Sequence, residues 1–201
     1  MQFNSNNYEE KKSSTVFPLG ESISGVTISN IKYATPEECK NKNGGIDITY
    51  KKDDTELRDR RFIPDLDNVQ PRDGETMKDA QERTFRMFNS VLHHIASKFS
   101  TTEINGTSIV DYAKKWCAAM LNDCSGNKFY LKTVLNNNGY VNVPKYPNFI
   151  QNMASGESEL TYTEKQKEEN AENDKVRKER MSMSSANLTP SATASSSSAW
   201  A

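Results

Sequence analysis

The chain has 201 residues, enough for one domain of ordinary size with tails. Its formal net charge of −1 argues against a histone-like or strongly basic nucleic-acid-binding protein, although a local basic groove is compatible with it. Three cysteines without a C-x-x-C pair argue against a disulfide framework and a zinc site. Because no apolar run resembles a signal peptide or could span a bilayer, we expect a cytoplasmic protein without a membrane partner.

Composition divides the chain into three parts. Residues 1–14 form a polar arm without periodicity, and most large apolar residues lie within residues 15–154. Residues 155–201 are first charged and then rich in serine. Since the ion pairs of a solvated helix contribute only tenths of a kcal/mol each, we expect this tail to be frayed or disordered.

Alternation of apolar and polar residues predicts three consecutive strands, over residues 24–35, 44–54 and 55–64. In the first strand, Val26 and Ile28 share one face, whereas Ile31 and Tyr33 would share the other face of an unbroken strand. A bulge at Ser29–Asn30 would bring all four side chains to one side.

Two helices and a hairpin follow. Apolar residues at three- and four-residue spacing predict a helix from Met77 to Phe99, and a second, shorter helix begins near Ile109. Each follows a capping signal, Thr76 with Asp79 and Ser108 with Asp111. The stretch 128–144 alternates on both sides of an Asn138-Gly139 turn, and PKYPNFIQN then predicts an ordered exit strand or loop.

The order of these elements predicts the fold class. Five strands with two helices between the third and fourth are the order of an OB-fold barrel, although other α+β domains share it. We therefore expect an α+β chain with a five-stranded OB-like barrel, a two-helix insertion and a disordered C-terminal tail.

Catalytic signals are weak. The chain has no phosphate-binding glycine loop and no nucleophile elbow. The only histidines, His93 and His94, are adjacent and so cannot share one helix face as metal ligands; we expect His93 to border the core and His94 to be partly exposed. Cys117 is expected in the core, and Cys124 has no evident catalytic partner. We expect no enzyme, no cofactor and no metal.

Basic and aromatic residues instead indicate a binding surface. Single-stranded nucleic acid is held by cations along its phosphates and by aromatic rings under its bases. Tyrosine also stabilises sheets and lysine protects sheet edges, so each residue alone has an ordinary structural explanation. The nucleic-acid-binding candidates are Tyr130, Lys132, Tyr140, Arg58 and Arg60, with Lys32 and Lys145 as flanking cations.

Two stretches, SGVTISNIKYATPEE and NKFYLKTVLNNNGYVNVPKYPNFI, carry a family resemblance within residues 16–153. The chain resembles the single-stranded DNA-binding proteins of tailed bacteriophages, which are OB-fold proteins with a helical insertion and a flexible C-terminal tail. The resemblance implies a role in phage DNA replication or recombination, in the host cytoplasm. In that family the tail tip is often acidic and recruits replication proteins, whereas the tip here, SSSSAWA, has no acid.

Three functions are compatible with the sequence. The first is single-stranded DNA binding without catalysis, with replication proteins as further partners through the tail. The second is a protein–protein module, such as a small virion or assembly accessory protein, in which exposed tyrosines are contact anchors. The third and weakest is a replication enzyme, such as a nuclease, whose motif is not evident.

Overall fold

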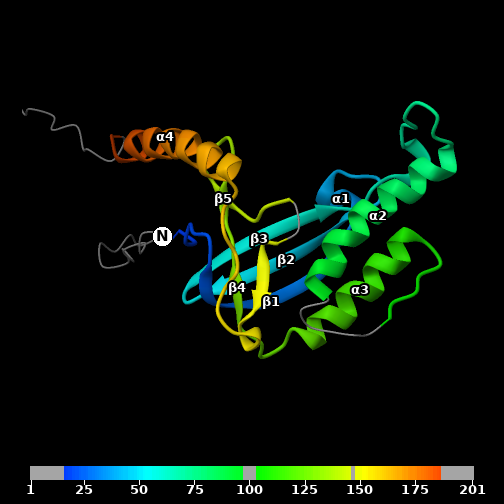
Figure 1. Cartoon of the computed structure of the whole chain (residues 1–201), viewed down its shortest axis with the longest axis horizontal. Helices are drawn as coiled ribbons and strands as arrows, with labels where there is room; N and C mark the ends of the chain where they lie inside the picture. Colours follow the sequence, from blue (N-terminus) through cyan, green and yellow to red (C-terminus); the bar gives the residue numbers. More distant parts are fainter. Residues whose placement is uncertain (1–15, 97–102, 146–147, 187–201) are drawn as a thin grey trace, which may run out of the picture.

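A computed structural model describes residues 16–96, 103–145 and 148–186 of the chain. Its centre is a five-stranded antiparallel sheet in the order β3-β2-β1-β4-β7 (Figure 1). A separate antiparallel pair, β5 with β6, forms a hairpin. The strands are β1 (Ile23–Ala34), β2 (Gly45–Lys52), β3 (Thr55–Phe62), β4 (Phe129–Leu131), β5 (Val134–Leu135), β6 (Val141–Asn142) and β7 (Ile150–Asn152).

The expected bulge in β1 is confirmed. The register between β1 and β2 shifts between Ile28 and Asn30, and Val26, Ile28 and Ile31 are all buried. The extra residue returns the apolar side chains to one side of the strand. One face of β1–β3 therefore builds the core, and the other face is free to carry polar residues.

Helices lie mainly at one end of the sheet (Figure 1). Thr76 and Ser108 accept hydrogen bonds from the backbone N–H of Asp79 and Asp111, so both predicted caps are confirmed. Residues 97–99 of the expected first helix lie outside the described residues. The helices are α1 (Pro36–Cys39), α2 (Met77–Ala96), α3 (Ile109–Asp123) and α4 (Glu164–Ala186), with short 3-10 turns η2 (Leu66–Asn68) and η3 (Met153–Ser155).

One core joins α2 and α3 to the sheet. Trp116 and Met120 of α3 are buried in the same cluster as Ile48 and Tyr50 of β2 and Phe129 of β4. The helices therefore cover the inner face of β1–β3, which leaves the outer face of these strands uncovered in the described part of the chain.

The α+β class, with two helices between the third and fourth strands, agrees with the sequence, but two details differ. The fifth strand of the sheet is β7, in the segment predicted as an exit strand or loop, whereas residues 140–144 belong to the separate hairpin. Among the described residues, no strand pairing closes the sheet between β3 and β7. The Arg61 side chain of β3 donates to the carbonyls of Pro144 and Lys145, which follow β6.

The charged segment expected to be frayed forms α4 in the structure. Its anchors are polar, because Asn170 accepts a hydrogen bond from the Leu135 N–H at 2.8 Å and Asn173 donates to the Leu135 carbonyl at 3.0 Å. These bonds replace a neighbouring strand along β5, so α4 is held without a large apolar face. The arm 1–14 and the Ser-rich end 187–201 lie outside the described residues.

Candidate nucleic-acid interface

Three side chains of β3 point away from the core. Arg58, Arg60 and Phe62 occupy every second position of the strand, and successive side chains of a strand point to opposite faces. The Phe62 ring is 54% exposed although it is a large apolar group, and the Arg58 side chain is also 54% exposed. A cationic pair and an uncovered aromatic ring therefore follow one another along a single strand.

Asp47 of β2 holds the two arginines in place. Its carboxylate accepts hydrogen bonds from Arg60 Nε at 2.7 Å and Arg60 Nη2 at 2.9 Å, and Arg58 Nη2 bonds the same carboxylate. Burial alone would raise the pKa of the Asp47 carboxyl, but the bonds from Arg60 and Arg58 outweigh burial and lower this pKa below its ordinary value. Asp47 is therefore an ionised anchor that fixes two guanidinium groups at the surface.

The outer sides of β1 and β2 extend this surface, and we call the exposed face with Lys32, Lys51, Arg58, Arg60 and Phe62 the basic face. Strand pairing places Lys32 and Arg60 on the two sides of Asp47, and Lys51 opposite Glu56. Arg58 lies opposite Thr49 in the row between them. These three rows thus hold four cations and two acids, although Lys32 also pairs with Glu38 of α1 at 3.3 Å.

The other four predicted residues are not among the five side chains of the basic face. Tyr130 is half-buried on β4 opposite Gln151 of β7. Tyr140 of the hairpin is 56% exposed, but the Arg180 guanidinium of α4 stacks on its ring at 3.7 Å. Lys145 is exposed beyond β6. The structure thus divides the predicted residues between the basic face and the neighbourhood of the hairpin.

For Lys132, the expected position on a solvated strand face is wrong. This side chain is 5% exposed, and its Nζ donates to the Thr161 carbonyl at 3.0 Å. The segment that leads into α4 covers it, and Tyr162 of that segment also donates to the Thr133 carbonyl at 2.6 Å. Alternation along the hairpin could not reveal a cover that comes from thirty residues later.

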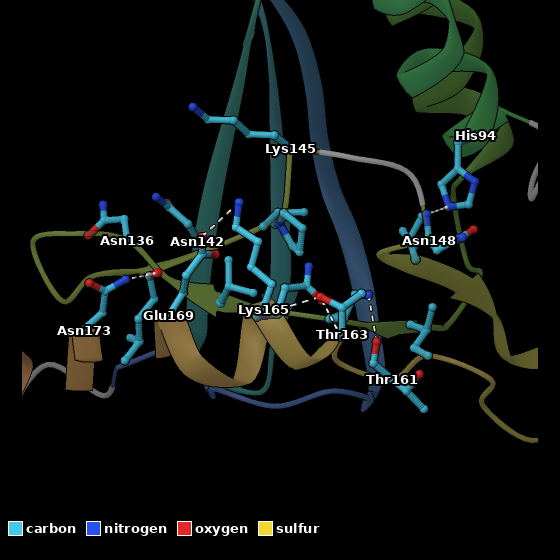
Figure 2. A pocket seen from close by; sticks show the side chains of 18 of the residues that line it. His94, Asn136, Asn142, Lys145, Asn148, Thr161, Thr163, Lys165, Glu169 and Asn173 are labelled. Atoms are coloured by element: carbon cyan, nitrogen blue, oxygen red, sulfur yellow. Dashed lines mark hydrogen bonds and ion pairs between the residues drawn. The ribbon is translucent and has the colours of Figure 1, made fainter. Parts of the chain in front are cut away.

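A groove of about 1070 Å³ lies between the hairpin, residues 144–145 and 148–151, and the start of α4 (Figure 2). Lys132 and Lys145 line it, together with Lys165 of α4 and with the side chains of Asn142 and Asn148. Sequence reasoning does not foresee this groove, because one of its walls is α4. Phe62 could have been found, since the spacing of two from Arg60 places it on the same strand face.

The histidines and cysteines do not form an evident catalytic or metal site among the described residues. His93, expected to border the core, is exposed. His94 is half-buried, in agreement with its expected partial exposure; it packs on the Phe149 ring at 5.4 Å and accepts a hydrogen bond from the Asn148 N–H. Burial raises the pKa of Cys117 and that of Cys124 to about 12, which leaves both thiols protonated and poorly nucleophilic at neutral pH. The described residues contain no cluster suited to a metal ion and no helix able to cross a membrane.

Comparisons of the chain with family models, curated proteins and solved structures returned no match.

Proposed function

We propose that this chain binds single-stranded DNA on the basic face, without catalysing a reaction. The observation that carries the proposal is the run Arg58, Arg60, Phe62, which presents two oriented guanidinium groups and an exposed ring on one strand. These are the two devices that hold a single strand: cations track the phosphates, and a flat ring stacks under a base.

Asp47 improves the arginines for this role. A guanidinium has five N–H donors. The bonds to Asp47, together with the bond from Arg60 Nη1 to the Glu38 carbonyl, use only some of them, so the remaining donors can bind phosphate oxygens. Because the side chains are already ordered by Asp47, little conformational entropy is lost on binding. The mixed charge of the face favours moderate affinity over the tight, indiscriminate binding of a strongly basic surface.

The strand order supports an OB-like interpretation of the fold. An OB barrel has the order 3-2-1-4-5, and the order here is β3-β2-β1-β4-β7, with α2 and α3 inserted after β3. In that fold the second and third strands carry the binding surface, and here these are β2 and β3. We therefore propose an OB-like barrel in which side chains such as Arg61 link β3 to the residues just after β6 and to Phe149, just before β7.

Fluorescence anisotropy of a labelled oligothymidylate at low salt tests the proposal. Phe62→Ala removes the exposed ring, and we expect the dissociation constant to rise by about fivefold to a hundredfold, the loss of one stacking platform. Since Phe62 is exposed, its truncation should leave the melting temperature nearly unchanged.

Two further variants control this experiment. Phe62→Leu keeps an apolar side chain without an aromatic ring and should bind as weakly as Phe62→Ala. Met87→Ala removes an equally exposed apolar group from α2 and should bind normally. If the wild-type chain ignores the oligonucleotide at micromolar concentration but forms a defined assembly by light scattering, the protein–protein alternative replaces this proposal.

A further inference from the structure

Lys132 is a buried cation without a counter-ion at the floor of the groove. Its Nζ has one hydrogen-bond acceptor, the Thr161 carbonyl, and no carboxylate of the described residues lies within ion-pair distance of it. Burial lowers the pKa of the Lys132 ammonium, and the more distant charge of Glu21 only partly opposes this. Burying an ammonium without a partner is costly, and a methionine would fill the same space at lower cost.

The lining of the groove suggests what would offset this cost. Lys145 and Lys165 add two cations to Lys132, against Glu159 and Glu169. Glu169 lies 3.7 Å from Lys165 Nζ, so this acid is already engaged in part. An anionic group inside the groove would complete the hydrogen bonding of the Lys132 ammonium and would be favoured by the flanking lysines.

Two amide side chains face the same space from separate segments. Asn142 lies on β6 and Asn148 precedes β7, and both surround the groove in Figure 2. Within the described residues neither side-chain amide has a hydrogen-bond partner. An amide offers a donor and an acceptor side by side, which is the pattern that the hydrogen-bonding edge of a nucleobase requires.

We propose that this groove is a nucleotide-binding site, with a phosphate group beside Lys132 and a base against Asn142 and Asn148. A volume of about 1070 Å³ is slightly above the ~300–1,000 Å³ range usual for small-ligand sites, so the groove can admit a free nucleotide or a short stretch of a strand. A free nucleotide would bind independently of the proposed function, whereas entry of a strand rests on it.

Isothermal titration calorimetry of the full chain distinguishes binding of a free nucleotide from binding of a strand. The ligands are thymidine 5′-monophosphate, thymidine and a short oligothymidylate. We expect the monophosphate, the oligonucleotide or both to bind, and thymidine to bind at least about tenfold more weakly than the ligand that carries phosphate. Lys132→Met should weaken that binding by at least about tenfold, since it removes a charge-assisted hydrogen bond. Lys128→Met, on the same strand segment but outside the groove lining, should change nothing.

A second variant guards against loss of the fold. Lys165 is exposed, so Lys165→Met leaves the structure intact and should weaken phosphate-ligand binding by about two- to fivefold. The inference is overturned if thymidine binds as tightly as its monophosphate, if neither phosphate ligand binds, or if Lys132→Met and Lys165→Met bind as the wild type does. Phe62→Ala should leave monophosphate binding unchanged, which separates failure of the groove from failure of the basic face.

Discussion

Asp47 is the residue on which the geometry of the basic face depends. We expect Asp47→Asn to lower the free energy of unfolding at pH 7 by about 1–3 kcal/mol, because charge-assisted bonds to two guanidinium groups are lost inside a buried site. Urea unfolding measures this change. The exposed acid of the same face provides the control, since Glu56→Gln should stay within about 0.5 kcal/mol of the wild type.

Acid should abolish the difference between Asp47→Asn and the wild type. The pKa of Asp47 is lowered in the folded state, so its contribution is complete above the ordinary carboxyl value and is lost as the pH falls through the lowered pKa. A gap in unfolding free energy that stays constant from pH 7 down to acid unfolding would show that the charge of Asp47 is not what stabilises the site.

At the same scale, individual residues show where sequence reasoning stops. Arg58, Arg60 and Phe62 follow from alternation, because a strand places every second side chain on one face. Lys132 obeys the same alternation but is buried by Thr161 and its neighbours, which join it only through the tertiary fold. Periodicity predicts a face of a strand, whereas the cover of that face depends on contacts distant in sequence.

Among the elements, α4 depends on how closely it approaches the hairpin. Gly139 has φ of +70°, and a Cβ there would lie 2.7 Å from the Arg177 Cα. Gly139→Ala should therefore release α4. A polar helix on its own is marginal in water, so hydrogen–deuterium exchange should then accelerate across residues 164–182. We expect an acceleration of tenfold or more, which corresponds to a loss of about 1.4 kcal/mol or more in the free energy that protects the helix from opening.

A second glycine separates the clash from backbone strain. Gly126 has φ of +77°, and a Cβ there would have no atom within 4 Å, so Gly126→Ala introduces left-handed strain without a clash. This variant should keep α4 protected from exchange. Equal exchange in residues 164–182 for the two variants would mean that the close approach at Gly139 does not hold the helix.

The elements with local signals are predictable, and those held by distant partners are not. The bulge in β1 follows from a slip in its alternation, and the starts of α2 and α3 follow from their capping residues. By contrast, α4 has no apolar stripe, and its anchors Asn170 and Asn173 resemble any polar residue of a solvated helix. Strand β7 is short and follows two prolines, which hides its pairing with β4.

For the whole molecule, the distribution of charge over the surface matters more for binding a polyanion than the net charge does. Residues 155–201 contain six Lys and Arg against eight Asp and Glu, so the rest of the chain carries +1 of the total of −1. The basic face concentrates four cations on one side of three strands. The proposed binding of DNA should therefore depend on salt, but through few phosphate contacts.

The salt dependence of oligothymidylate binding measures how many phosphates the basic face contacts. With up to four phosphates neutralised by Lys32, Lys51, Arg58 and Arg60, the slope of log K against log salt should be about −2 to −3. Lys32→Gln should make the slope shallower by about 0.7, because one counterion fewer is released, and it leaves the bonds between Arg60 and Asp47 intact. Lys175→Gln in α4 removes the same charge elsewhere and should preserve the wild-type slope. A slope near zero would rule out phosphate contacts on the basic face, and one steeper than about −5 would require cations beyond it.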